Sequence, residues 1–370
     1  MFFAIIVFIL ILSIIIFVHE FGHFILAKKT GVLVEEFCIG FPPRIWKKKK
    51  GETLYSIGII PFGGFNKLYG EIDEKQKHIN DPKSFISKPP RVKALIVFGG
   101  VAANIFLAVI IFYFSLGVSG FISNQSLFFD YQFPFGTQNN FVMVSGVVEN
   151  SPAEKKGIQS KDIVIKGNGI EFTNSQQFID FVEQNKGKEI NLCLQDLFTR
   201  EQRNISIVPR VNPGEGQGPL GVFLVDIAQV SYLKPLEKAG SGFLHSFNIL
   251  HYSCFGFGHL IKLSFQERDI KPLSSSVAGP LGILSITKLT MQAGFIPTIN
   301  LLALISLTIA FFNILPIPAL DGGKLIFLGI EAIIKKPFPQ KIEQDLTVFF
   351  FVLLIFILIL VTFKDIQRFF

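Results

Sequence analysis

Two histidines and a glutamate stand close together near the N-terminus, in the stretch HEFGH that runs from His19 to His23. Histidines four positions apart share one face of an α-helix, so both imidazoles can reach a single Zn²⁺. Zinc lowers the pKa of its water to about 7, and a carboxylate beside the first ligand can take a proton as that water attacks a carbonyl. The spacing therefore predicts His19 and His23 as metal ligands and Glu20 as the general base of a hydrolase.

A catalytic zinc usually has three protein ligands and one open position, so a third ligand must come from elsewhere in the chain. The best candidate is Asp321, in the segment NILPIPALDGG from Asn313 to Gly323. Pro316 and Pro318 lack backbone donors and interrupt the apolar helix that precedes them. Irregular backbone at membrane depth lines a cavity or is buried in protein, so we expect Asp321 to face the two histidines. The other interpretation of Asp-Gly is a simple turn after a helix.

The composition indicates an integral membrane protein. Of the 370 residues, 49% are hydrophobic and only 17% are charged, whereas about a quarter are charged in soluble domains. A membrane-spanning helix needs about 17–25 residues, and four apolar stretches are long enough: 2–27, 94–121, 295–315 and 346–363. An ionisable side chain in the bilayer costs about 2.5–3.5 kcal/mol, and HEFGH places three in one turn. This cost argues against a chance cluster and favours a functional metal site.

The basic residues predict which loops are cytoplasmic. They follow the first apolar stretch, precede the second and separate the third from the fourth: Lys28, Lys29, Arg44, Lys47 to Lys50, Arg91, Lys93, Lys335, Lys336 and Lys341. By the positive-inside rule these loops are cytoplasmic and both termini lie outside. At a rise of about 1.5 Å per residue from Phe2, His19 lies roughly 25 Å into an apolar core of about 30 Å. The site is then just inside the cytoplasmic face, and the net charge of +7 orients helices rather than binding nucleic acid.

A polar insert at 141–224 has the pattern of a small α/β domain. Alternation in INLCL and NISIV predicts strands, and QQFIDFVEQ has apolar residues at helical spacing. The order of these segments, with SPAEKKGI before them, resembles a bacterial PDZ domain, a fold that binds extended peptide ends at a sheet edge. Such domains often have glycine where this chain has Lys161. The alternative is an unrelated small α/β insert.

Within the segment 240–290, residues 243–265 are apolar but interrupted by three histidines, two glycines and Lys262. We expect an interfacial amphipathic helix rather than a fifth span. Its histidines, His245, His251 and His259, are six and eight positions apart, so they do not share one helical face. That spacing argues against a second metal site.

The chain resembles the bacterial site-2 protease family, and among its members the regulator-of-sigma-factor proteases with a single PDZ domain. The resemblance rests on HEFGH in the first span, N-x-x-P-x-P-x-x-D-G in a later span and the PDZ-like insert between them. The resemblance covers essentially the whole chain. It implies an intramembrane zinc metalloendopeptidase with Zn²⁺ held by His19, His23 and Asp321, and with Glu20 as catalytic base. It also implies single-span substrates in the bacterial plasma membrane, such as anti-sigma factors already cut by another protease, or remnant signal peptides.

Further segments match features of that family. Asn313 opens the second motif, and the resemblance implies that it helps to hold substrate or transition state. Asn104 closes a G-x-x-x-N element of the second span, and we expect it, like Gly63 and Gly64, to contact substrate or transition state; for Asn104, ordinary helix packing is the alternative. Residues 53–70, with a turn at Gly63 and Gly64, are expected to form a β-hairpin that dips into the membrane and pairs with unwound substrate. The alternative for this segment is a cytoplasmic hairpin without membrane contact.

The sequence thus predicts a mainly α membrane protein with four transmembrane helices, a membrane-associated β-hairpin and an inserted α/β PDZ domain. Its expected parts are an N-terminal membrane part (1–121), an extracytoplasmic PDZ domain (141–224), an interfacial segment (240–290) and a C-terminal membrane part (295–363). The competing functional hypotheses are a non-catalytic membrane scaffold that presents the PDZ domain, and a transporter. The intact HExxH motif argues against the scaffold, and the lack of a visible inverted repeat argues against the transporter.

Overall fold

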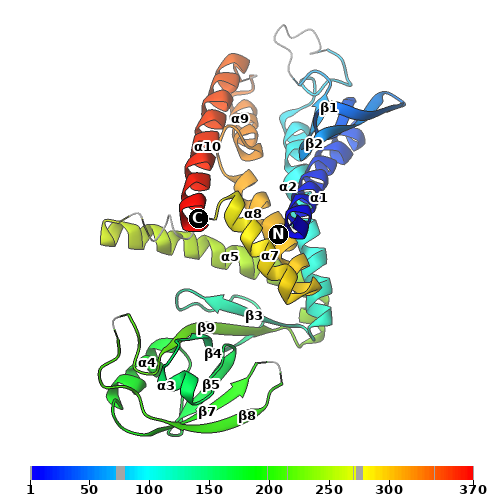
Figure 1. Cartoon of the computed structure of the whole chain (residues 1–370). Helices are drawn as coiled ribbons and strands as arrows, with labels where there is room; N and C mark the ends of the chain where they lie inside the picture. The colour runs from blue at the N-terminus through cyan, green and yellow to red at the C-terminus, as the bar shows by residue number, and fades with distance from the viewer. Residues whose placement is uncertain are drawn as a thin grey trace. The chain divides into compact units, whose positions relative to one another are not determined.

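The computed structural model describes residues 2–71, 80–197, 199–214, 216–269, 271, 278–336 and 338–369. They form two compact units, one of residues 1–115 and 245–370 and the other of residues 116–244 (Figure 1). Within the described residues, four helices are long and apolar enough to cross a membrane: α1 (Phe2–Lys29), α2 (Pro90–Val118), α8 (Phe295–Ile314) and α10 (Gln340–Phe369). Each contains most of one predicted span.

Two glycines bring α1 and α2 into backbone contact. A Cβ atom on Gly22 of α1 would lie 2.1 Å from the carbonyl oxygen of Gly99 in α2, so neither position has room for a side chain. Small residues of this kind let membrane helices approach closely. On another part of α1, Ile11 and Ile15 are buried against residues of α8. These contacts fix the turn of α1 that carries the HEFGH motif.

Three more helices complete the first unit: α5 (Pro235–Glu267), which begins in the second unit, α7 (Pro280–Ala293) and α9 (Asp321–Ile334). The chain leaves α8 in extended conformation at Leu315, and α9 starts at Asp321. The prolines between them prevent a continuous helix, so Asp321 occupies the first turn of a new one. The segment predicted to be interfacial falls on α5 and α7, except for residues outside the described ranges.

The first unit also contains a sheet of two long strands. β1 (Val34–Lys50) pairs antiparallel with β2 (Thr53–Leu68). The prediction placed both arms of the hairpin within 53–70, but the two arms of β2 do not pair with each other. The strand missing from the prediction is β1. Its VEEF stretch lacks the alternation of apolar and polar residues typical of strands, and its FPP stretch contains prolines, which usually argue against a strand.

The first part of β1 lies between the two arms of β2. Cys38 pairs with Ser56 on one side and with Phe65 on the other. Gly40 and Gly63 have φ values of 82° and 122°, which suit glycine where the strands turn back. Residues 64–68 therefore form an arm that pairs with β1 along one edge only among the described strands.

The second unit is built on a seven-stranded sheet in the order β3-β9-β4-β5-β7-β8, with β6 paired to β5. Its strands are β3 (Ile122–Leu127), β4 (Thr137–Val147), β5 (Asp162–Gly167), β6 (Ile170–Glu171), β7 (Ile190–Asp196), β8 (Gln202–Ile207) and β9 (Val222–Ser231). Its helices are α3 (Pro152–Lys155) and α4 (Ser175–Gln184), and α4 buries Phe178 against the sheet. The sheet extends beyond the predicted 141–224 at both ends, because β3 and β4 pair with β9.

Lys161 adopts a backbone conformation that favours glycine. Its φ is 80°, a left-handed value that glycine adopts readily and residues with a side chain rarely do. The preceding residues form a tight connection into β5, and the Lys161 N–H donates to the carbonyl of Val144 at 2.7 Å. The neighbouring strands thus impose the left-handed conformation, at a cost on the order of 1 kcal/mol for a residue with a side chain.

Candidate metal and catalytic site

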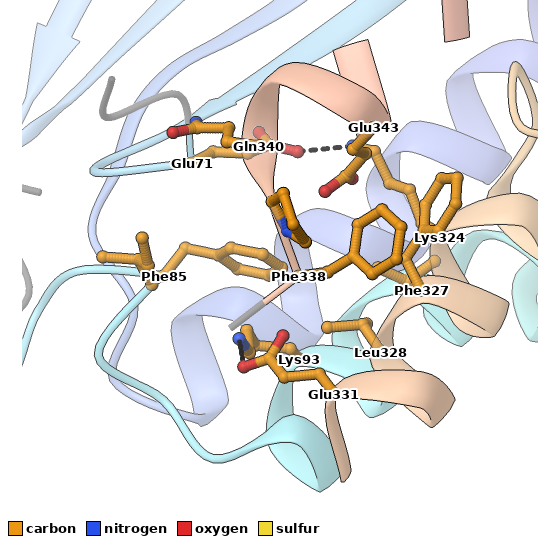
Figure 2. Close-up of a pocket in the computed structure, with 13 residues that line it drawn as sticks. Glu71, Phe85, Lys93, Lys324, Phe327, Leu328, Glu331, Phe338, Gln340 and Glu343 are labelled. Atoms are coloured by element: carbon orange, nitrogen blue, oxygen red, sulfur yellow. Dashed lines mark hydrogen bonds and ion pairs between the residues drawn. The ribbon is translucent and has the colours of Figure 1, made fainter. Parts of the chain in front are cut away.

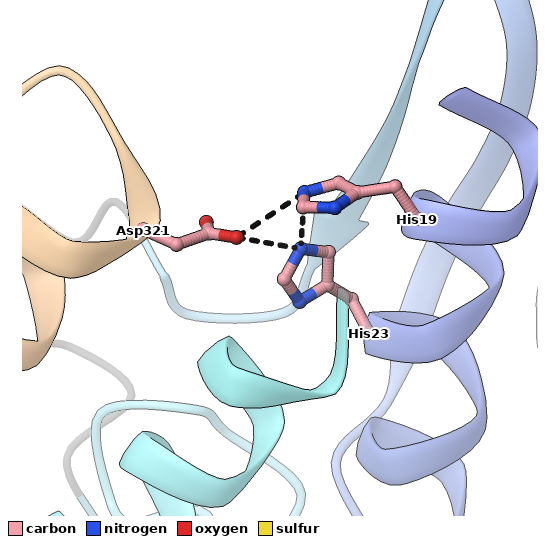
Figure 3. Close-up of side chains that lie close together, drawn as sticks. All are labelled: His19, His23 and Asp321. Atoms are coloured by element: carbon pink, nitrogen blue, oxygen red, sulfur yellow. Dashed lines mark hydrogen bonds and ion pairs between the residues drawn. The ribbon is translucent and has the colours of Figure 1, made fainter. Parts of the chain in front are cut away.

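His19, His23 and Asp321 come together from α1 and the start of α9 (Figure 3). The Nε2 atoms of the two histidines are 3.1 Å apart. Oδ2 of Asp321 lies 3.2 Å from Nε2 of His19 and 3.4 Å from Nε2 of His23. Among the residues that the structure describes, this is the one group of three histidine, cysteine or acidic side chains close enough to hold a metal ion.

The donor atoms of this group fit a zinc ion. Nδ1 of His23 lies 2.9 Å from the carbonyl of Ile96 and donates to it, so Nε2 keeps its lone pair. Oδ2 of Asp321 is buried, faces both Nε2 atoms and accepts no hydrogen bond from the residues that the structure describes. Electron-pair donors that face one another need a cation between them. Ligands at 2.0–2.1 Å from a tetrahedral zinc lie about 3.3 Å apart, in agreement with the observed separations.

Gly100 of α2 makes room for both imidazoles. A Cβ atom at this position would lie 2.4 Å from Nε2 of His23 and 2.7 Å from Cε1 of His19. Heavy atoms that are not bonded cannot approach so closely, so any side chain here would displace the rings. The close packing of α1 on α2 thus extends from the Gly22–Gly99 contact to the rings of His19 and His23.

Asn104 lies one turn further along α2 and is fully buried. Its Nδ2 is 3.4 Å from Nδ1 of His19, while its Oδ1 has no hydrogen-bond partner among the described residues. Half a rotation of the amide exchanges these atoms, so that Oδ1 accepts from the Nδ1–H of His19 and both groups are satisfied. In that arrangement Asn104 does for His19 what the Ile96 carbonyl does for His23, leaving Nε2 free to bind metal.

Asn104→Leu is expected to weaken zinc binding about 10–100-fold, because the partner that orients a ligating histidine is lost. Competition with a metallochromic chelator measures the affinity directly. Ser306→Ala is the matched control, since Ser306 donates to the backbone carbonyl of Asn104 at 2.9 Å and does not depend on its amide. Equal zinc affinity in Asn104→Leu and the wild type would show that the amide only packs the helices.

Glu20 belongs to α1, but its side chain accepts a hydrogen bond from β2. Nδ2 of Asn66 donates to Oε2 of Glu20 and to its backbone carbonyl, both at 2.7 Å. A Cβ on Gly64 would lie 3.2 Å from Cγ of Glu20, so this glycine packs against the Glu20 side chain. Gly63 instead packs on the ring of Phe41, and its place is in the turn. Asn66 was not predicted, because a single asparagine in a strand belongs to no motif.

The expected site residue Asn313 is not brought to this group. It is partly buried in the last turn of α8 and does not line the pocket of about 210 Å³ that contains His19, Glu20 and Asp321. The histidines of α5 are also elsewhere. His245 is buried against the ring of Phe112, and burial lowers its pKa to about 4.

A charged cavity of about 190 Å³ adjoins the pocket that contains His19, Glu20 and Asp321, between α2, α9 and the start of α10 (Figure 2). Lys93 pairs with Glu331 and Lys324 pairs with Glu71, each at 2.6 Å. The negative charge of Glu71 raises the pKa of Lys324 above its ordinary value, so this ammonium group stays charged. Glu71 and Lys324 line both spaces, and their ion pair therefore stands at the junction.

The second unit has a groove of about 330 Å³ between α4 and the start of β9. β4 pairs with β9 along its whole length, whereas β3 covers the other edge only from Asp226 to Ser231. Residues 222–225 thus leave an edge open beside the groove, next to the apolar side chains of Phe178 and Val182. An extended peptide of about four residues can add to such an edge.

Comparison with known proteins extends over nearly the whole chain. The sequence pattern of peptidase family M50 matches residues 7–357. The zinc metalloprotease RasP of Shouchella clausii is 28% identical over 440 residues, covering 98% of each chain. The regulator of sigma-W protease RasP of Bacillus subtilis is 27% identical over 437 residues, covering 99% of each.

Among solved structures, the PDZ domain of an SdrC-like protein from Listeria innocua is 26% identical. It covers 23% of this chain and 92% of that one, with a TM-score of 0.20. The family assignment rests on the sequence match, which spans the HEFGH motif, the insert and Asp321. The chain belongs to peptidase family M50.

Proposed function

We propose that this M50 peptidase is an intramembrane zinc metalloendopeptidase, which hydrolyses peptide bonds within the transmembrane segments of other membrane proteins. The observation that carries the proposal is the group formed by His19, His23 and Asp321 on and beside a helix apolar enough to cross a membrane. Relatives of nearly full length named as zinc metalloproteases support it.

In this proposal His19, His23 and Asp321 hold the zinc. When bound, zinc lowers the pKa of water to about 7, so that hydroxide is available as a nucleophile near neutral pH. Glu20 follows the first ligand in sequence and shares the pocket with all three. Its carboxylate accepts a proton from the attacking water and delivers it to the leaving nitrogen. Asn66 keeps that carboxylate turned into the pocket through its two hydrogen bonds.

A substrate helix hides its carbonyls in backbone hydrogen bonds and must unwind before it can be cut. We propose that the unwound segment adds to the open edge of residues 64–68, where strand pairing satisfies its freed backbone groups away from water. The support is the position of this arm, which pairs with β1 on one edge and contacts the general base Glu20.

We further propose that the chain crosses the bacterial plasma membrane four times, with both termini outside the cytoplasm. In this orientation the catalytic site lies near the cytoplasmic face, and the second unit is a PDZ domain outside the cell membrane. The basic residues beside the spans support this orientation. The open edge at residues 222–225 supports a role in reading peptide ends of substrates that another protease has already shortened, such as anti-sigma factors.

The proposal is tested on the purified chain in lipid vesicles with a single-span substrate. We expect about one zinc ion per chain, cleavage inside the apolar segment by mass spectrometry, and loss of activity on chelation that zinc restores. Asp321→Ala is expected to lose both zinc and cleavage. Zinc-free protein that binds peptides without cutting them would instead identify a membrane scaffold, and full cleavage by Asp321→Ala would overturn the ligand assignment.

A further inference from the structure

We propose that Asn66 is a positioning residue for the general base, and that it couples substrate pairing at the hairpin to the orientation of Glu20. The inference rests on the proposed protease function, in which Glu20 takes a proton from water. Among the described residues, Asn66 donates hydrogen bonds to Glu20 and makes none to His19, His23 or Asp321. The inference therefore concerns the base and not the metal.

Both acceptors of the Asn66 amide belong to Glu20. One NH₂ group bridges the backbone carbonyl and Oε2 of the same residue, each at 2.7 Å. A donor shared in this way restricts the torsions between backbone and carboxylate, and the bond to the charged oxygen is of the stronger kind. Oε2 is thereby engaged with the hairpin, which leaves Oε1 for the proton of the attacking water.

The direction of the Asn66 side chain is set by the sheet. Gly64 packs against Glu20 and Leu68 packs in the cluster around Ala27 of α1, so alternate residues of the arm face α1. Asn66 lies between them in the same register, opposite Phe37 of β1. A slip by one residue would turn Asn66 away and present a neighbouring side chain to Glu20.

This register connects substrate pairing and the position of Glu20 through one strand, the arm of residues 64–68. A substrate that adds to the open edge of residues 64–68 pairs with the backbone on either side of Asn66. The same strand, through the Asn66 side chain, holds the base. Ordering of the arm by substrate therefore also orders the carboxylate, so that proton transfer is set up when the extended segment is in place.

A purely structural amide would satisfy the hairpin's own backbone, and its loss would affect folding or metal content. A positioning amide affects the chemical step alone. The two roles are separated by measuring kcat, KM and zinc content together on the full chain in lipid vesicles.

The test uses Asn66→Leu, which removes the donor at similar volume, and Asn66→Asp, which keeps the shape but places a second carboxylate beside Glu20. Both are expected to lower kcat about 10–100-fold, as misplacement of a catalytic group does, with KM within about twofold. Zinc content should stay at one per chain. Lys83→Met is the control, because Lys83 lies outside the arm, is exposed and pairs with Glu52 at 2.7 Å.

Wild-type kcat in both Asn66 variants would overturn the inference, as would zinc loss in both or an equal fall in kcat for Lys83→Met. Asn66→Asp keeps the test valid if Asn66→Leu does not fold. Failure of the inference differs from failure of the proposed function: in the first case wild type cleaves and Glu20→Gln does not, while in the second the wild type itself does not cut the substrate.

Discussion

Glu20→Gln is expected to abolish cleavage while the protein keeps its zinc. Glutamine has the same shape and can still accept the Asn66 hydrogen bond through its carbonyl, but it cannot take a proton from water. General-base catalysis contributes about 10²–10⁴-fold, so we expect the rate to fall at least that far. Zinc should remain because Glu20 is not in the group of three side chains around the metal position. Cleavage of a single-span substrate and metal analysis of the same preparation measure the two effects.

The matched control is Glu52→Gln, which changes a glutamate in the turn between β1 and β2. Glu52 is exposed and pairs with Lys83 at 2.7 Å, and among the described residues it makes no hydrogen bond to Glu20. We expect wild-type kinetics. Residual cleavage above about a tenth of the wild-type rate in Glu20→Gln would assign the proton transfer to another group.

Gly100→Ala is the second change with a large expected effect, although it adds only one methyl group. The new Cβ would lie 2.4 Å from Nε2 of His23 and 2.7 Å from Cε1 of His19, and the α1–α2 contact at Gly22 and Gly99 prevents the helices from separating. The imidazoles must therefore turn away from Asp321. We expect loss of zinc and of activity together, measured by metal analysis and substrate cleavage.

Gly117→Ala in the same helix is the control. A Cβ there meets no atom within 4 Å, so the added methyl group has open space. In α2 this substitution should leave zinc content and cleavage unchanged. If Gly100→Ala retained full zinc occupancy and activity, the site would have to differ from the arrangement of His19 and His23 described above.

The residues around the metal position were accessible from sequence because their geometry is local. A four-residue spacing puts His19 and His23 on one face of a helix whatever the rest of the fold, and the prolines before Asp321 predict a helix break at that point. The structure then brings Asp321 to the two histidines. Asn313, assigned by resemblance alone, has no such local constraint and lies outside the pocket.

The hairpin was harder to predict because strand pairing is not local. Nothing in the stretch VEEFCIG predicts that it will lie between the two arms of β2, and the contact of Asn66 with Glu20 depends on that register. Lys161 shows the same limit, since the strands around it impose a positive φ that its residue type disfavours. Tertiary structure decided these positions, and residue preference did not.

Cutting a peptide bond inside a membrane also changes the charge of the substrate. One neutral amide becomes a carboxylate and an amine that is protonated near neutral pH, and hydrocarbon stabilises neither. The cavity beside the catalytic pocket carries the ammonium groups of Lys93 and Lys324 and the carboxylates of Glu71, Glu331 and Glu343. Side chains of opposite charge thus lie next to the place where each new chain end forms. We expect the products to leave through this cavity rather than back into lipid.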